Sequence, residues 1–363
     1  MGLGGVSVAS DYPEVSKDEL EKILNSLKKR FQNGDYPNYK ERIDRINRLK
    51  LLVEENSEDF HKALQNDFGT RHEQLSLLSD TLPIIASAKH ISKNLSKWMK
   101  PEKRKPNFPL GLLGAKAFIH NQPYGVVGII SPWNFPLNLS LGPLVEVFAA
   151  GNNAMMKLSE FVPETSDLTE KLVKQYFNDD EVVVINGGPQ TSQSFAGLAF
   201  DHLLFTGSTH IAKKIAYEAS ENLVPLTLEL GGKSPVIVGP KAKMKKSVDK
   251  IMMGKLLNAG QICISPDYVF LPEGKENEFV EHAKSYVQES YETLKNNPDY
   301  TSIIHLNHYE RLRSYISDAK SKGAEIVEIN PANEDLTQQE HHKIPPTLIL
   351  NPTDDMEVMK NEI

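Results

Sequence analysis

The chain has 363 residues, which exceeds what one hydrophobic core usually supports, so two domains are expected. Its 39% hydrophobic and 25% charged residues are ordinary for a globular protein, and a net charge of −7 argues against a nucleic-acid-binding surface. A single cysteine excludes an internal disulfide. No apolar run approaches the ~20 residues of a membrane span, and the start lacks a signal-peptide pattern. These features predict a cytoplasmic protein that contacts neither membranes nor nucleic acids.

The first hundred residues are predicted to be helical. Ser16 and Glu19 have the spacing of a capping box, and apolar residues from Leu20 to Phe31 recur at helical intervals. Further amphipathic runs follow, and a long helix is expected from about Glu73 to Met99. These apolar residues are interpreted as packing faces, without a catalytic pattern among them.

From Ala115 the pattern changes to alternating strands and helices. The strands are expected near residues 126–130, 154–158, 182–185, 202–205 and 226–230. Repeated β-α-β units predict a parallel sheet with helices on both faces and ligands at its carboxyl edge. The alternation restarts after Gly231. We therefore predict an α/β protein with one domain within residues 1–230, a second α/β domain over 231–363, and a site in the cleft between them.

Three short segments carry the residues that suggest chemistry. They read SPWNFP, LELGGKSP and NAGQICISPDY, and they supply the amide of Asn134, the carboxylate of Glu229 and the thiol of Cys263. Taken alone, each has a simpler interpretation. A lone cysteine is more often a small buried hydrophobic residue, and Asn134 suits a turn before Pro136. Residue type alone therefore leaves the roles open.

Together these segments, with FTGSTHIA, resemble the aldehyde dehydrogenase superfamily, and most of all its class 3 branch with the coniferyl aldehyde dehydrogenases. The resemblance implies that Cys263 attacks an aldehyde and that Asn134 stabilises the resulting oxyanion. It implies that Glu229 is the base that activates water, with a pKa raised by a partly apolar setting. Relatives that transfer the acyl group to coenzyme A generally lack this glutamate, so release of a free acid is expected.

The resemblance also assigns a dinucleotide cofactor, and it implies that residues 1–230 contain a Rossmann-like cofactor domain and residues 231–363 a catalytic domain. It implies that Lys157 and Glu160 hold the hydroxyl groups of the adenosine ribose. From the residues alone, the two would be interpreted as a surface ion pair. A carboxylate at Glu160 should repel a 2′-phosphate, so NAD is favoured, with NADP possible. No sequence cluster has the spacing of a metal site.

Further cofactor contacts are implied elsewhere. Gly207 and Ser208 open a helix whose N-terminus suits a pyrophosphate, although a simple Gly-Ser helix cap is the alternative. Trp133 is expected to line the cofactor crevice or merely to pack. Gly231 is expected at the cofactor, and Glu362 matches the glutamate that binds the nicotinamide ribose in the family.

The chain ends at Ile363, where the family pattern continues into Phe-Gly-Pro. From this we expect open strand edges, a loosely held Glu362 and weak or absent activity. The family is usually oligomeric, so a homodimer is expected for a complete chain, with a β-rich oligomerisation segment near 115–130. A second interpretation is a non-catalytic remnant that binds nucleotide or partner subunits.

Overall fold

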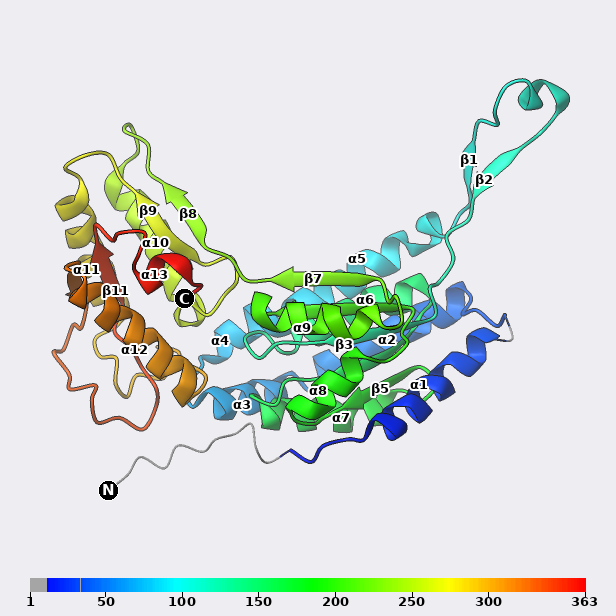
Figure 1. The fold of residues 1–363 in the computed structure, drawn as a ribbon, viewed down its shortest axis with the longest axis horizontal. Coiled ribbons are helices and arrows are strands. Elements are labelled where there is room, and N and C mark those ends of the chain that lie inside the picture. The colour runs from blue at the N-terminus through cyan, green and yellow to red at the C-terminus, as the bar shows by residue number, and fades with distance from the viewer. Residues whose placement is uncertain (1–11, 33) are drawn as a thin grey trace.

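The computed structural model describes residues 12–32 and 34–363, and Figure 1 shows an elongated molecule with a central sheet. The beginning of the chain, on which the signal-peptide prediction rests, lies outside these residues. Among the helices described, none is long and apolar enough to cross a membrane.

The central sheet has five parallel strands in the order β5-β4-β3-β6-β7. These strands are β3 (Val126–Ile130), β4 (Asn153–Lys157), β5 (Val182–Ile185), β6 (His202–Gly207) and β7 (Leu226–Leu230). The chain runs outward from β3 to β5 and then returns to place β6 on the other side of β3. This reversal creates a topological switch point at the carboxyl edge, where sheets of this type bind ligands. The predicted parallel sheet is confirmed.

Helices cover both faces of this sheet because its strands are apolar on both sides. One face, with Val127 and Ile129, packs against α2, α3, α5, α6 and α7, and the other, with Val126 and Ile130, packs against α1, α8 and α9. The helices are α1 (Lys17–Gln32), α2 (Tyr39–Glu55), α3 (Ser57–Phe68), α5 (Leu82–Trp98), α6 (Asn138–Ala150), α7 (Pro163–Tyr176), α8 (Pro189–Ala196) and α9 (Thr209–Ser220).

The long helix expected over residues 73–99 is interrupted. It consists of α4 (Glu73–Ser76), a π-helical segment η2 (Leu77–Thr81) and then α5. Within η2, Asp80 is fully buried and its carboxylate binds groups outside its own helix. The apolar periodicity does not reveal this interruption, because a π-turn shifts the register by only one residue.

A β-hairpin projects from the end of the molecule opposite the chain's C-terminus (Figure 1). Its strands β1 (Glu102–Arg104) and β2 (Ala117–Ile119) are antiparallel, and a 3-10 turn, η3 (Leu110–Leu113), lies near its tip. The β-rich stretch predicted at 115–130 therefore divides between this exposed hairpin and the buried core strand β3.

Residues after Gly231 form their own sheets and a separate core. The elements are β8 (Ser234–Ile237), α10 (Met244–Leu256), η4 (Leu257–Gly260), β9 (Pro266–Phe270), α11 (Glu276–Ser290), α12 (Leu306–Ser321), β10 (Glu325–Glu328), β11 (Thr347–Leu350) and α13 (Glu357–Lys360). Strands β8 and β9 are parallel, and β10 and β11 are antiparallel. This restart of the alternation was predicted, whereas the division into domains at residue 231 stays a prediction.

Candidate active site

The loop that carries Cys263 has an uncommon backbone conformation. Asn258, Ala259 and Gly260 have φ angles of 50°, 51° and 79°, so three successive residues are left-handed. Such angles cost non-glycine residues of the order of 1 kcal/mol each, and they persist only where surrounding contacts enforce them. Cys263 follows in a turn and is exposed. The thiol is therefore accessible, which the buried-hydrophobe interpretation did not expect.

The side chain of Gln261 holds this loop in place. Its Nε2 donates to the carbonyl oxygens of Asn258 and Ser302, each at 3.0 Å, and its Oε1 accepts from the Ile304 backbone at 3.0 Å. All three bonds are buried, where a polar group left without a partner would be costly. Gln261 therefore ties the cysteine loop to the segment that precedes α12.

Asn134 joins the same loop from the other half of the molecule. It follows β3, and its Nδ2 donates to the backbone oxygen of Gln261 at 3.1 Å. Its Oδ1 accepts from the Phe135 backbone at 3.0 Å, which fixes the orientation of the amide. The fold thus brings Asn134 into contact with Gln261, which precedes Cys263 by two residues.

Glu229 lies on β7, opposite Thr206 of β6, at an edge of the central sheet. Glu229 is exposed in the part of the chain that the structure describes. The expectation of a partly apolar environment around its carboxylate is therefore wrong. The link from β7 to β8 does pass close to the cysteine loop. A Cβ atom added to Gly232 would lie 3.2 Å from the carbonyl oxygen of Cys263. Gly232, three residues after Glu229 in the chain, therefore lies close to the backbone of Cys263.

Glu362 is held more firmly than the sequence suggested. Its carboxylate lies directly over Gly231, because a Cβ atom there would be 1.5 Å from Oε2, and the nearby Gly232 backbone amide favours its charged form. Arg311 donates to its carbonyl oxygen at 2.8 Å, and Lys233 donates to the Asn361 oxygen at 3.1 Å. Burial raises its pKa, although the Gly232 amide opposes that shift. The expectation of a loosely held Glu362 is wrong, because these contacts fix its backbone.

Lys157 and Glu160 lie together at the carboxyl end of β4. The Lys157 ammonium is buried and donates to the Leu158 oxygen at 2.6 Å and to Glu160 Oε2 at 3.2 Å. Burial lowers the pKa of Lys157, and the neighbouring Glu160 opposes that effect. The pair is therefore not the surface ion pair that the residues alone suggested. A buried cation beside a less buried carboxylate offers the donor and acceptor that a ribose diol needs.

The Gly207-Ser208 turn and Trp133 also lie near this edge. Ser208 caps α9 by accepting from the Ile211 backbone at 3.4 Å, so the helix-cap interpretation holds while the helix N-terminus still faces the carboxyl edge. Trp133 packs on Phe68 at 6.4 Å and edge-on against His308 at 5.2 Å. The structure therefore gives Trp133 a packing role at the cleft.

Two histidines at this cleft were not predicted. His305 lies 4.6 Å from the ring of Phe161, and His308 lies 4.4 Å from His305 and next to Trp133. Burial lowers the pKa of His305 to about 4 and that of His308 to about 3, so both are neutral at pH 7. The i, i+3 spacing in HLNH is the signal that would have placed both on one helix face.

Buried polar atoms without partners also mark this cleft. Among the residues that the structure describes, Ser131 Oγ and His305 Nε2 are two that make no hydrogen bond. Buried polar groups normally find partners, and these two flank the aromatic cluster that contains Trp133. Together with the Lys157–Glu160 pair and the α9 N-terminus, they fit a polar ligand of dinucleotide type. For residues 12–32 and 34–363, no cluster of metal-ligating side chains is found.

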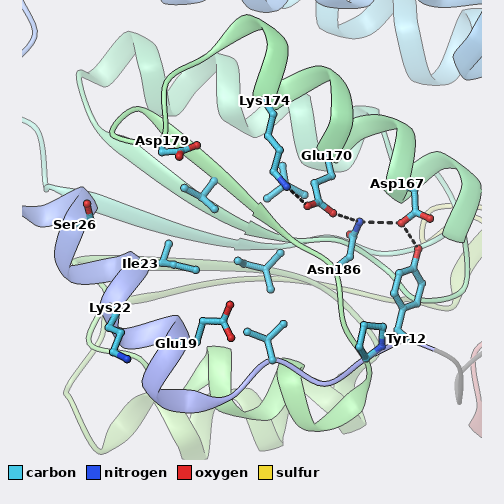
Figure 2. A pocket seen from close by; sticks show the side chains of 15 residues that line it. Tyr12, Glu19, Lys22, Ile23, Ser26, Asp167, Glu170, Lys174, Asp179 and Asn186 are labelled. Carbon is cyan, nitrogen blue, oxygen red and sulfur yellow. Dashed lines mark hydrogen bonds and ion pairs between the residues drawn. The ribbon is translucent and has the colours of Figure 1, made fainter.

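A separate cavity of about 780 Å³ lies between α1 and α7, along the edge strand β5 (Figure 2). Tyr12 donates to Asp167 at 2.8 Å, and Asn186 bridges Asp167 and Glu170. None of the predicted site residues lines this cavity. It is therefore distinct from the group of residues around Cys263.

An open parallel sheet with helices on both faces makes this an α/β protein, and the hydrogen bond between Asn134 and the Cys263 loop lies at the carboxyl edge of that sheet. The chain belongs to the aldehyde dehydrogenase family, whose model matches residues 6–363. It is a homologue of NAD(P)-dependent aldehyde dehydrogenases.

Individual relatives agree with this family. The chain is 50% identical over 359 residues to a probable coniferyl aldehyde dehydrogenase of Caulobacter vibrioides, covering 99% of this chain and 73% of that protein. It is 44% identical to a coniferyl aldehyde dehydrogenase of a Pseudomonas species, with 100% and 73% covered. A substrate-bound structure of Staphylococcus aureus AldH superimposes with a TM-score of 0.87 at 32% identity, covering 94% of this chain and 73% of that one.

A more distant structure shares the fold. It is the aldehyde dehydrogenase of Mycobacterium tuberculosis complexed with NAD+, which superimposes with a TM-score of 0.84 at 22% identity. The alignment covers 96% of this chain and 72% of that one. The resemblance stated from the sequence motifs is confirmed at the level of the family.

Proposed function

We propose that this protein oxidises an aldehyde to a carboxylic acid, with NAD(P) as the hydride acceptor and Cys263 as the nucleophile. The observation that carries the proposal is the hydrogen bond from Asn134 Nδ2 to the Gln261 oxygen. It joins an amide donor from one half of the molecule to a loop in the other half, and that loop carries the chain's only cysteine. A thiol and an oriented amide side by side are the parts that aldehyde addition needs.

The residues act in a fixed order. The Cys263 thiolate forms a C–S bond to the aldehyde carbon, and the carbonyl π electrons move to oxygen as an alkoxide. The Asn134 amide has two N–H donors, one of which is used on Gln261, so the second remains for this alkoxide. A bound NAD(P) supplies the acceptor for the hydride that the carbon then releases. The C=O bond re-forms, and a thioester on Cys263 remains.

Hydrolysis completes the cycle. Glu229 takes a proton from water, the hydroxide adds to the acyl carbon, and the Cys263 thiolate leaves with the electrons of the C–S bond. The products are a carboxylic acid, a reduced cofactor and one proton. Because Glu229 is exposed on an edge strand, water reaches it directly.

The cofactor contacts follow the same cleft. Lys157 and Glu160 would hold the adenosine ribose, and the helix that starts after Ser208 would face the pyrophosphate. Glu362, close over Gly231, would hold the nicotinamide ribose. The Glu160 carboxylate disfavours a 2′-phosphate, so NAD is preferred over NADP.

The assay measures formation of reduced cofactor by purified protein with NAD and a cinnamyl-type aldehyde such as coniferyl aldehyde, after which the Caulobacter and Pseudomonas relatives are named. Cys263→Ala should abolish turnover, whereas Ile264→Ala, at the next exposed position, should retain it. Turnover that survives Cys263→Ala would overturn the proposal. A folded protein that binds NAD without turnover would favour the non-catalytic interpretation, and a requirement for coenzyme A would contradict hydrolytic release.

We further infer that the hairpin mediates a homodimer. Phe108, Leu112 and Leu113 near its tip are 86%, 79% and 80% exposed, an apolar group that a monomer would leave in water. Replacing Leu112 and Leu113 by Ser should convert a dimer to a monomer in light scattering. An unchanged mass would contradict this role. A catalytic thiol also suits a reducing compartment, which favours the cytoplasm.

A further inference from the structure

Arg71, whose side chain is fully buried, contacts the loop that carries Asn134. Its Nη1 donates to the Asn134 carbonyl oxygen at 2.7 Å, and its Nη2 donates to Asp80 Oδ2 at 2.5 Å. The guanidinium lies between two aromatic rings, 4.6 Å from Phe68 and 5.3 Å from Phe135. Arg71 therefore cannot turn away from the loop without leaving its charge buried and unpaired.

Asp80 holds the other end of the same loop. Its Oδ1 accepts from the backbones of Leu137 and Asn138 at 3.2 and 3.3 Å, at the start of α6. A carboxylate at a helix N-terminus satisfies backbone donors that would otherwise lack partners. The Arg71–Asp80 pair thus fixes residues 134–138 from both sides, through side chains that are 0% exposed.

The residue before Arg71 reaches the cysteine loop. Thr70 Oγ1 lies 2.5 Å from Ser302 Oγ, and the Ser302 backbone donates to the Thr70 oxygen at 3.1 Å. The Ser302 oxygen in turn accepts from Gln261, two residues before Cys263. Adjacent residues on one short segment therefore contact both halves of the site.

We propose that Arg71 and Asp80 are positioning residues that aim the Asn134 amide at the oxyanion formed on the Cys263 adduct. The inference rests on the proposed function. A buried ion pair is no better for stability than apolar residues of similar volume, so packing alone does not account for it. What the pair supplies is direction, because its hydrogen bonds fix the loop whose amide must meet a developing charge.

The test removes both charges together. In Arg71→Met/Asp80→Asn, the methionine fills the space between the rings and the asparagine keeps an oxygen acceptor for the α6 backbone. We expect kcat to fall about 10- to 100-fold, as a small misplacement of a catalytic group does, with KM for NAD unchanged. The matched control, Lys284→Met/Glu281→Gln, makes a similar change in an exposed ion pair of α11, away from the hairpin and the site, and should not alter kcat.

A double-mutant cycle separates positioning from a general structural effect. In the Asn134→Ala background there is no amide to aim, so the Arg71→Met/Asp80→Asn change should cause no further loss of kcat. If the combined variant instead loses kcat by the product of the two separate factors, the inference is overturned. If the double variant does not fold, Arg71→Lys keeps the charge but cannot reach Asp80 and Asn134 as a fork, and wild-type kcat in that variant would also overturn it.

A second readout does not require turnover. Cys263 is the only cysteine, so its rate of alkylation by iodoacetamide reports on its loop alone. Arg71→Met/Asp80→Asn and Asn134→Ala should change this rate by similar factors, and combining them should add nothing. If the wild type has no dehydrogenase activity but this cycle is non-additive, the proposed function fails while the positioning role stands. Independent effects on alkylation would refute the positioning role even in an active enzyme.

Discussion

Replacing Gly231 by Ala should displace the carboxylate of Glu362. A Cβ atom at Gly231 would lie 1.5 Å from Oε2 and 2.3 Å from Cδ, well inside van der Waals contact. The φ angle of Gly231 is not left-handed, so alanine fits the backbone, and the three nearest atoms to the added Cβ all belong to the Glu362 carboxylate. Because that carboxylate is the end of a flexible side chain, it can swing away. We expect the protein to fold normally.

The expected loss of NAD affinity follows from the contact that the Glu362 carboxylate loses. A displaced Glu362 gives up the favourable interaction of its carboxylate with the Gly232 backbone amide. A hydrogen bond to a charged group contributes about 1.5–3 kcal/mol, and the partial exposure of this carboxylate favours the lower figure. If the same orientation serves the nicotinamide ribose, about 1.4 kcal/mol corresponds to tenfold weaker binding of NAD.

Isothermal titration of NAD into Gly231→Ala, Glu362→Gln and the wild type measures this change directly. Gly239→Ala is the control, because a Cβ atom there would have no neighbour within 4 Å. Both site variants should weaken binding by about tenfold, and the control should not. Wild-type affinity in both would show that Glu362 does not contact the cofactor. Weakening in Glu362→Gln alone would show that the crowding at Gly231 does not displace it.

Two further predictions concern stability. Glu181→Ala leaves the buried Arg45, its partner at 3.0 Å, without a countercharge, so urea unfolding should show a loss of about 3–5 kcal/mol; Asp44→Ala, on an exposed ion pair, should change it by less than about 0.5 kcal/mol. The pKa values of His305 and His308 are lower in the folded protein than in the unfolded chain, so the unfolded chain binds protons first as pH falls. The contribution of these two residues to the free energy of unfolding is therefore fully present above pH 6.5 and is lost as pH falls towards 4. Allowing for partial screening, unfolding at pH 5 should show a loss of about 2 kcal/mol relative to pH 7, and a flat profile would contradict the burial of both rings.

The sequence was sufficient for the central sheet because its strands are short apolar runs separated by helices. Residues 126–130 were placed without error, since a strand buried on both faces has a continuous apolar pattern. The interruption at η2 was missed because it depends on Asp80, a charged residue buried by partners at positions 71, 137 and 138. No local pattern announces contacts with such distant positions.

Within the site, the motifs placed Asn134 and Cys263 on loops that do meet. The sequence could not give their environment, and the two errors have the same origin. Glu229 was expected in an apolar setting and is exposed, whereas Glu362 was expected to be loose and its backbone is held. Both depend on which other segments pack nearby, and one sequence does not reveal these tertiary contacts.

The hydrogen bonds around Cys263 explain why the motifs contain so many polar residues that need not touch a substrate. Gln261 uses both ends of its side chain on backbone groups, and Asn134 uses one amide hydrogen and its oxygen the same way. These bonds offset the unfavourable left-handed run at Asn258 and Ala259, which precedes the exposed Cys263 in the same loop. Strain at the nucleophile loop is therefore stabilised by the neighbours that orient the oxyanion donor. A substitution that relaxes one should misplace the other, so the thiol and the amide behave as one unit.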